Sequence, residues 1–517
     1  MLGMDATAVL ATMAALTAQP AAPPAPAPEA ARPAIPKGPA RTVGTAIRRA
    51  QLTGAITWQQ RVQWEEELKV ARAAARRLPE NRAREIRGVL RIAERLADRG
   101  QLQAERLTPV MKAVSATTTT FRLKPFPRPG QRLGFPGDGL VYEYRAGYGI
   151  QPHPLATAGR LNALAGTCLH TTPPRCRPAQ LAMTAAALTD LGVESGGRLR
   201  LEYVFPFGRG EPPWSSSMAQ ATSAQALARA GMALEEPRYA RAATGAYRAL
   251  VSPATSVRRD GQVTRFAMYS FQPSMRVLNG ELQTLVGLGD YARVSGSVSA
   301  RRVLRRAAKR MRTQLPVWDT GAWTLYSAGG REATLHYHGL AATFARRVCL
   351  RRVAKGFCPA ARRYARYTVE PPRLTVRAAR VAKAGRTLRV QVRSSKLASG
   401  SVTVRGPRGV VLSQAVTAGR RTQTIRVVPR VRGRYRITLT GTAVNGRRDV
   451  ARAAVKVKKR TAAEQRAYEA RRRRAARRAQ ERRERAAKRA ERERRERAQE
   501  RERDAAEQRD GGDRPAD

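Results

Sequence analysis

The chain has 517 residues, 42% of them apolar, so it is long enough to bury a large core and to carry more than one domain. Lys and Arg outnumber Asp and Glu by 98 to 39, which gives a formal net charge of +59. Aromatic residues make up only 5% of the chain, too few for many base-stacking platforms. Because the sequence also has no zinc-finger, RRM-type or helix-turn-helix signature, nucleic acid is disfavoured as a partner.

The positive charge is not concentrated at one end of the chain. Residues 460–517 contain 21 basic and 14 acidic residues, a net +7, which leaves +52 for the rest. One interpretation is codon bias in a GC-rich genome, because Arg greatly exceeds Lys. The other is functional: a basic surface concentrates a polyanion and raises its association rate, and an acidic, uronate-containing polysaccharide would qualify.

Residues 1–45 are interpreted as a leader followed by a Pro/Ala-rich linker, with the short apolar run AVLATMAALTAQPAAPPAPAP. Asp5 stands where an export signal usually carries a basic residue, so either the start codon is misassigned or the segment is a flexible leader. No stretch of about 18 apolar residues occurs, and we expect no membrane span. The favoured location is secreted or in the cell envelope.

Four cysteines fall into two local pairs, and each pair closes a short loop. An even number with local pairing favours disulfides, and disulfides would support export independently of the leader. A zinc site and free thiols are the alternatives, but neither spacing is of the CxxC type and only His170 lies near a pair. We expect no metal, and the predicted disulfides are Cys168–Cys176 and Cys349–Cys358.

The first two thirds of the chain show apolar residues at helical spacing. Residues 46–120 are predicted to hold a helical hairpin, with Pro79 in the joint. After short extended pieces, residues 121–368 are predicted to form helix after helix, arranged as an α/α toroid whose loop ends make a cleft for a sugar chain. One helix, from Ser299 to Leu315, has arginines on one face and an apolar face consisting of Ala300, Leu304, Ala307, Met311 and Leu315.

Residues 369–458 follow a different period. Apolar residues alternate with polar ones in several short runs, such as Leu388, Val390 and Val392, with Gly and Asn-Gly turns between the runs. The predicted structure is a small immunoglobulin-like β-sandwich with a carbohydrate-binding or spacer role. The fold class is thus mostly α with a β-domain.

Residues 459–517 are predicted to form a charged single helix and a disordered tail. After Tyr468 the only apolar residue up to Arg509 is Ala, so no coiled-coil seam is available. Pairs of opposite charge four residues apart favour a solvated helix, and an electrostatic tether to an anionic polymer is the alternative. The predicted pairs are Glu481–Arg485, Glu484–Lys488 and Glu493–Arg497.

Most familiar catalytic motifs are absent. The four histidines have no GxSxG serine or cysteine-nucleophile motif beside them, which excludes hydrolase triads. His336 and His338 would share a strand face, but no third metal ligand is evident. Three tyrosines, Tyr269, Tyr326 and Tyr337, instead lie in unusual segments at expected loop or strand edges around an amphipathic helix.

Six motifs follow one another around these tyrosines. They are GIQPHP at 149–154, WSSSMAQ at 214–220, YSFQPSMRVLNG at 269–280, LVGLGD at 285–290, LPVWDTG at 315–321 with Tyr326, and Tyr337-His338. In their order and in most local spacings they resemble the C-terminal domain of D-glucuronyl C5-epimerases, over about residues 145–365. The resemblance implies a toroid that inverts C5 of a D-glucuronyl residue in a heparosan-like polymer without a cofactor.

By position, the resemblance makes Tyr269, Tyr326 and Tyr337 the acid/base set. Epimerisation removes a proton next to a carboxylate and returns one to the opposite face, so two groups must flank the ring. A phenol has a pKa near 10, and a nearby cation can lower it while neutralising the substrate carboxylate. The substrate-binding candidates are Arg331, Asn279, Arg276, His338, Trp214 and Gln220.

The chain departs from the family pattern at two positions near the tyrosines. The family's acidic residue before the first tyrosine is Met268 here, and the arginine expected three residues after the second is Gly329, with Arg331 two positions later. A uronate polysaccharide lyase on the same fold, which would use the same carbanion, and a non-catalytic glycan-binding protein at the cell surface are therefore the alternatives.

Overall fold

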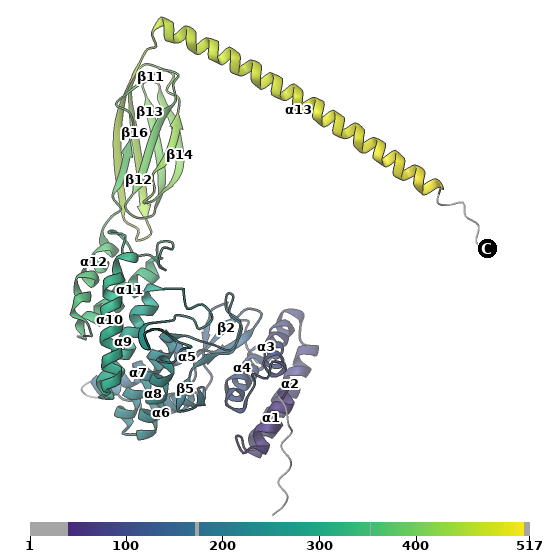
Figure 1. The fold of residues 1–517 in the computed structure, drawn as a ribbon, viewed down its shortest axis with the longest axis vertical. Helices are drawn as coiled ribbons and strands as arrows, with labels where there is room; N and C mark the ends of the chain where they lie inside the picture. The colour runs from purple at the N-terminus through teal and green to yellow at the C-terminus, as the bar shows by residue number, and fades with distance from the viewer. Residues whose placement is uncertain (1–39, 171–174, 352, 511–517) are drawn as a thin grey trace, which may run out of the picture. The chain divides into compact units, whose positions relative to one another are not determined.

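The computed structural model describes residues 40–170, 175–351 and 353–510, and Figure 1 traces the elements along the chain. The predicted leader falls almost wholly outside these ranges. The described residues form two compact units: residues 40–133 with 143–152, and residues 134–142 with those described from 153 to 510. The predicted boundary near residue 120 is therefore replaced by a crossing, in which the segment around residue 147 returns to the first unit. Each unit is described separately.

In its described residues the first unit has four helices and a small sheet, which is more than the predicted hairpin. Thr42 and Thr57 each form a reciprocal capping box, which fixes the starts of the first two helices. Pro79 precedes the third helix, as the sequence predicted. The elements are α1 (Val43–Leu52), α2 (Trp58–Arg77), α3 (Glu80–Asp98), α4 (Ala104–Leu123), β1 (Arg132–Leu133), β2 (Tyr142–Arg145) and β3 (Gly149–Pro152).

The turn between β2 and β3 packs directly on α3. The carboxylate of Glu85, which is 1% exposed, accepts a hydrogen bond from the backbone N–H of Gly147 at 2.7 Å. A Cβ at Gly88 would lie 2.2 Å from the Gly147 carbonyl oxygen, so only glycine permits this approach. This contact explains why the β2–β3 segment belongs to the first unit.

The second unit begins with a region of helices and short hairpins (Figure 1). Its elements are α5 (Pro154–His170), α6 (Pro178–Asp190), β4 (Val193–Ser195), β5 (Arg198–Arg200), β6 (Glu202–Tyr203), β7 (Trp214–Ser215), α7 (Ser217–Leu234), α8 (Pro237–Leu250), β8 (Ser256–Arg259), β9 (Gln262–Phe266), α9 (Leu278–Val294), α10 (Val298–Gln314), η1 (Leu315–Val317), α11 (Leu335–Leu350), η2 (Lys355–Phe357) and α12 (Cys358–Val369).

Helix α7 lies at the centre of this helical region and packs against α5, α8 and α9. Small side chains make the close packing possible: a Cβ at Gly287 of α9 would lie 2.6 Å from the Ala221 carbonyl oxygen of α7. Helix α10 covers the outside of the core. Its buried face is the predicted one, and Ala300, Leu304, Ala307, Met311 and Leu315 are each at most 9% exposed.

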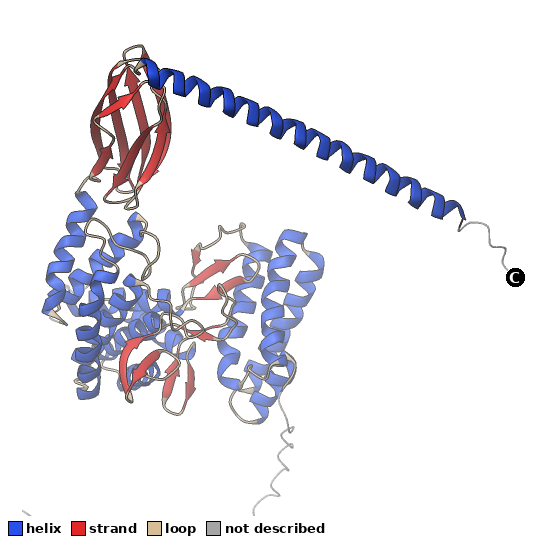
Figure 2. Cartoon of the chain, turned by 45° about the horizontal axis from the view of Figure 1, so that its top comes forward, coloured by secondary structure: helices blue, strands red, loops and turns tan. Residues whose placement is uncertain are grey.

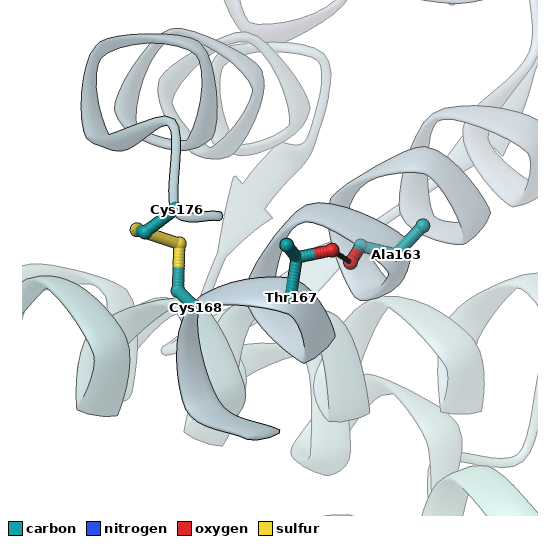
Figure 3. Close-up of a disulfide and its surroundings, with 4 residues drawn as sticks. All are labelled: Ala163, Thr167, Cys168 and Cys176. Carbon is teal, nitrogen blue, oxygen red and sulfur yellow. Dashed lines mark hydrogen bonds between the residues drawn. A yellow bond between two sulfur atoms is a disulfide. The ribbon is translucent and has the colours of Figure 1, made fainter. Parts of the chain in front are cut away.

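Two disulfides join segments of the helical region. Cys168 near the end of α5 is bonded to Cys176, just before α6, with the two Cα atoms 4.3 Å apart (Figure 3). Thr167 beside it donates a hydrogen bond from its hydroxyl to the Ala163 carbonyl at 3.1 Å. Cys349 of α11 is bonded to Cys358 at the start of α12, with a Cα separation of 4.9 Å. Both pairings link neighbours in sequence.

Residues 374–458 form two antiparallel-dominated sheets around one apolar core (Figure 2). The predicted alternation agrees with the burial: Leu388, Val390 and Val392 are each at most 3% exposed. The three-stranded sheet has the order β10-β12-β15 and the five-stranded sheet β11-β17-β16-β13-β14. The strands are β10 (Leu374–Arg377), β11 (Val381–Lys383), β12 (Leu388–Ser394), β13 (Ala398–Gly406), β14 (Gly409–Ala418), β15 (Gln423–Val427), β16 (Gly433–Ala443) and β17 (Arg448–Lys458).

This sandwich contacts the end of α12 through two polar side chains. Lys396 is 1% exposed, and its ammonium donates to the Tyr367 and Glu370 carbonyls at 2.9 Å each. Burial lowers the pKa of Lys396. The Asn445 amide donates to the Glu370 carbonyl at 2.8 Å. These contacts explain why the sandwich belongs to the same compact unit as the helices.

Helix α13 (Ala462–Asp510) continues the chain as one charged helix. Its ion pairs differ from the predicted ones because most of them place arginine before glutamate. Arg477 pairs with Glu481 at 3.0 Å, and Arg489 pairs with Glu493 at 2.9 Å. Across the described residues, no helix is both long enough and apolar enough to cross a bilayer.

Candidate functional site

Two segments that are far apart in the sequence pair to hold the second tyrosine. The Leu278 N–H donates to the Tyr326 carbonyl at 3.2 Å, and the Ala328 N–H donates to the Arg276 carbonyl at 3.0 Å. The Tyr326 N–H in turn donates to the Arg331 carbonyl at 3.0 Å. Tyr326 is therefore held on both sides by backbone hydrogen bonds directly before α9 and α11.

The third tyrosine lies in the first turn of α11, not at a strand or loop edge as the sequence suggested. Thr334 caps this helix and its hydroxyl accepts from the Tyr337 N–H at 3.3 Å. The rings of Tyr326 and Tyr337 meet edge to face, with centroids 4.7 Å apart. Burial raises the pKa of Tyr326, and its charge repulsion and hydrogen bond with Tyr337 raise that pKa further. Tyr326 therefore retains its proton at neutral pH.

Tyr269 lies in an aromatic cluster of its own. Its ring is 5.3 Å from that of Phe271, 5.4 Å from that of Phe207 and 5.7 Å from that of Trp214. Ser270 ties this segment to β7, since its N–H donates to the Ser215 carbonyl at 2.9 Å. The structure thus brings the Tyr326 and Tyr337 rings together, and it places Tyr269 among Phe207, Trp214 and Phe271.

The structure places His338, a predicted substrate-binding residue, inside the protein. It follows Tyr337 on α11 but is 0% exposed, and its ring stacks on that of Trp323 at 3.7 Å. Its Nε2–H donates to the Tyr364 carbonyl at 3.0 Å, so Nδ1 accepts from the Thr324 hydroxyl at 2.8 Å. Burial lowers the pKa of His338 to about 4. The neutral ring fastens α11 to α12.

Other predicted substrate-binding residues are also buried. The Gln220 side chain, 1% exposed, accepts from the Leu201 N–H and donates to the Leu199 and Ala246 carbonyls. Trp214 is 5% exposed, and its indole N–H donates to the Phe205 carbonyl at 2.7 Å. Asn279, 6% exposed, lies in the first turn of α9. Gln220 and Trp214 have no free polar group for a sugar in this conformation, and they act as scaffold instead.

The two predicted arginines differ in availability. The Arg276 guanidinium is paired with Glu281 at 2.9 Å and lies over the Trp318 ring at 4.5 Å. The small cavity of about 20 Å³ beside this pair has room for about one water molecule and not for a sugar. Arg331 is exposed, so it can reach a ligand outside the protein.

Met268 occupies the position where the epimerase family has an acidic residue. It is 7% exposed, and a Cβ added at Gly280 would lie only 2.4 Å from its sulfur. Met268 therefore packs against the first turn of α9 and fills a gap that glycine leaves open. A carboxylate at this position would be buried against α9.

Three neighbours of the tyrosines were missed in the sequence. Phe207 and Phe271 flank Tyr269, and a Cβ at Gly210 would lie 2.2 Å from the Phe271 ring. His336 is exposed, and its ring centroid is 5.5 Å from that of Tyr337. The aromatic spacing of YVFPF at 203–207 was the available signal for Phe207, and that of YSF at 269–271 was the signal for Phe271. His336 and His338 lie on a helix, so they share no strand face.

Within the described ranges, no group of three or more His, Cys, Asp or Glu side chains is arranged to hold a metal ion. The chemistry that these residues can perform is that of phenols and one exposed guanidinium. Phenols can transfer protons to and from a bound carbon acid.

The central part of the chain matches a known family. Residues 195–349 match the family model described as D-glucuronyl C5-epimerase C-terminus. This match confirms the resemblance recognised in the sequence, and the matched residues contain all three tyrosines. The family suggests an enzyme of the isomerase class that acts on carbohydrate.

A curated relative gives a second, weaker similarity. An uncharacterized protein of Methanocaldococcus jannaschii is 26% identical over 148 residues, which are 27% of this chain and 48% of that protein. The chain thus spans about half the length of the curated relative that it matches. The name of this relative describes no activity.

Proposed function

We propose that the chain is a D-glucuronyl C5-epimerase-like enzyme that inverts C5 of uronate residues in a polysaccharide. The observation that carries the proposal is the Tyr326–Tyr337 pair, with ring centroids 4.7 Å apart, inside the region that matches the epimerase family. Phenols of this kind can remove a proton from a carbon acid and return one to it.

The reaction needs one group on each face of the sugar ring. A phenolate removes the C5 proton, the electron pair delocalises into the neighbouring carboxylate, and a phenol on the other face returns a proton to C5. Tyr326, whose pKa is raised, is suited to the donor role. Arg331 is exposed and can offset the charge that develops on the substrate carboxylate. Because Tyr337 is hydrogen-bonded to Tyr326 and its ring contacts that of Tyr326, Tyr269 is the tyrosine proposed for the other face.

The same proposal includes the architecture and the location. The helical pairs α5 to α12 are taken as an α/α toroid, and the following sandwich as immunoglobulin-like. The two local disulfides support a secreted or cell-envelope protein, because such bonds persist in oxidising compartments. The partner is an acidic, uronate-containing polysaccharide, consistent with the chain's formal charge of +59.

Incubation with heparosan in heavy water, followed by proton NMR, tests this function. An epimerase replaces the C5 proton of glucuronate with deuterium and generates iduronate signals, whereas carboxyl-reduced heparosan stays unchanged. A lyase also exchanges this proton but yields an unsaturated product that absorbs in the ultraviolet. Absence of C5 exchange with heparosan and other glucuronate polymers would leave only the glycan-binding alternative.

A further inference from the structure

The sandwich carries positive charge with almost no acid to balance it. Residues 371–458 contain 22 Lys and Arg residues and a single carboxylate, Asp449. That carboxylate is already engaged, since its Oδ2 accepts from the Leu374 N–H at 2.7 Å. Other sandwich cations find partners outside it: Lys383 pairs with Glu464 and Arg420 with Glu332. Most of the positive charge remains without an internal counter-ion.

Part of this charge converges on one hollow, which we name the basic groove. It has a volume of about 790 Å³ and lies where β11, β16 and β17 meet. No carboxylate lines it. Within the described residues, no carboxylate forms a salt bridge with a cation of the groove. The six cations are Arg380, Arg432, Arg434, Lys456, Lys458 and Lys459.

The strand register forces like charges together in the groove. Arg434 of β16 is directly opposite Lys456 of β17, and both side chains are exposed. On the same sheet Arg436 is directly opposite Arg405. Like charges at facing positions destabilise a sheet. A bound polyanion would remove this repulsion. If the sandwich served only as a spacer, nothing would offset the repulsion.

We propose that the basic groove binds the anionic polysaccharide itself, as a second contact site apart from the tyrosines. The polymer's identity rests on the proposed function; the charge of the ligand rests on the groove alone. Carboxylates spaced along one chain would contact the six cations in turn. A polymer held there has a raised local concentration near the catalytic region of the same protein.

The groove chemistry favours polysaccharide over nucleic acid. Binding of single-stranded nucleic acid uses exposed aromatic rings on which bases stack, in addition to cations. The only aromatic residue of the sandwich is Tyr435, which is 1% exposed, with its hydroxyl donating to the Val431 carbonyl. The groove thus offers charge and hydrogen-bond donors without a stacking platform, which suits a flexible chain of carboxylates.

The test compares two variants of the full chain that lose equal charge. The groove variant removes three cations from the groove, and the control variant removes three exposed cations at the other end of the sandwich, where Asn445 contacts α12. Replacing arginine or lysine by glutamine keeps most of the side-chain volume. The substitutions are Arg432→Gln, Arg434→Gln and Lys456→Gln in the groove variant, and Arg421→Gln, Arg447→Gln and Arg448→Gln in the control variant.

Fluorescence anisotropy with end-labelled heparosan measures Kd at low salt, without any need for catalysis. We expect the groove variant to weaken binding roughly 10-fold or more and to show a smaller salt dependence, and the control variant to change Kd less than about 2-fold. Carboxyl-reduced heparosan, which has lost its charge, should bind neither the wild-type protein nor the two variants. Equal weakening by both variants would overturn the proposal and indicate diffuse charge. Tighter, groove-dependent binding of single-stranded DNA would overturn it in favour of nucleic acid.

The binding result separates this proposal from the enzymatic one. Because the groove cations lie outside the tyrosine segments, the groove variant should retain the wild-type rate of C5 exchange on short oligosaccharides. Groove-dependent binding without any exchange would uphold the groove and refute the epimerase. C5 exchange together with binding that does not depend on the groove would uphold the epimerase and refute the groove.

Discussion

The helical region and the sandwich treat charged side chains in opposite ways. In the helical region, buried carboxylates are surrounded by cations: Asp290, 1% exposed, contacts Arg351 and lies 3.3 Å from Arg293. In the sandwich, one carboxylate accompanies 22 cations. Arginine therefore has two uses in this chain. Where an acid is buried beside it, arginine holds helices together; where none is, it is available to an external anion.

Breaking a buried pair should have the largest effect on stability. Asp290→Ala would leave the cations of Arg351 and Arg293, and the Gln225 amide that donates to it at 2.5 Å, without their acceptor. We expect a loss of about 3–5 kcal/mol in the free energy of unfolding, measured by urea titration. Asp449→Ala in the sandwich is the matched control and should cost about 1 kcal/mol, the value of one hydrogen bond. Similar losses in the two variants would contradict the contrast between the regions.

The buried histidine should make the helical region sensitive to acid. The pKa of His338 is lowered to about 4 in the folded protein, and an unfolded chain has a histidine pKa near 6.5. The unfolded state therefore binds the proton first, so stability is complete above pH about 6.5 and falls as the pH drops toward 4. The loss from this residue is at most about 3 kcal/mol.

Urea midpoints of wild type and His338→Gln between pH 7 and pH 4 measure this contribution. Glutamine can still hydrogen-bond but does not titrate, so its midpoint should fall less across this window. The nearby charged groups, Asp319 and Lys396, are the same in both proteins and cancel in the comparison. Parallel pH profiles for the two proteins would refute a neutral His338.

The second disulfide should contribute a smaller amount. Replacing both Cys349 and Cys358 by alanine opens a loop with a sequence separation of 9 residues, which is worth about 2–3 kcal/mol by loop-closure entropy. Mass spectrometry of the exported, unreduced protein should find Cys168 bonded to Cys176 and Cys349 to Cys358. Four free thiols would argue against an oxidising location.

The charged tail should contribute almost nothing to the stability of the rest. Every described side chain from Glu469 to Gln499 is exposed, and its ion pairs are internal to α13. Deleting residues 469–517 should therefore change Tm by less than about 1 °C in calorimetry. A drop of several degrees would mean that the tail packs on the folded body.

Local periodicity predicted much of the fold. The α10 face and the alternating strands of the sandwich were recognised correctly, because in both cases the side that is buried repeats within one element. The first unit was predicted too small. Its β2–β3 segment is attached by Glu85 and Gly88, and a buried glutamate contact between distant segments leaves no periodic signal.

The site was predicted less well than the fold, for a related reason. Motif similarity located the tyrosine segments, and the family match agrees with it. The same motifs also contain residues that build the scaffold, and a sequence shows no difference between the two. His338 and Gln220 are conspicuous polar residues whose every hydrogen bond is directed inward. Only the three-dimensional packing separates them from the partly exposed tyrosines beside them.

In the proposed reaction, tyrosines exchange the C5 proton from opposite faces of the sugar. Deuterium entry at C5, measured by NMR from a glucuronate polymer and from an iduronate polymer, tests it directly in Tyr269→Phe, Tyr326→Phe and Tyr337→Phe. Losing the acid or the base should slow exchange about 100- to 10,000-fold. Because each hydroxyl serves one face of the sugar, a given substitution should slow exchange unequally in the two polymers. Equal, small effects at all three positions would contradict the account.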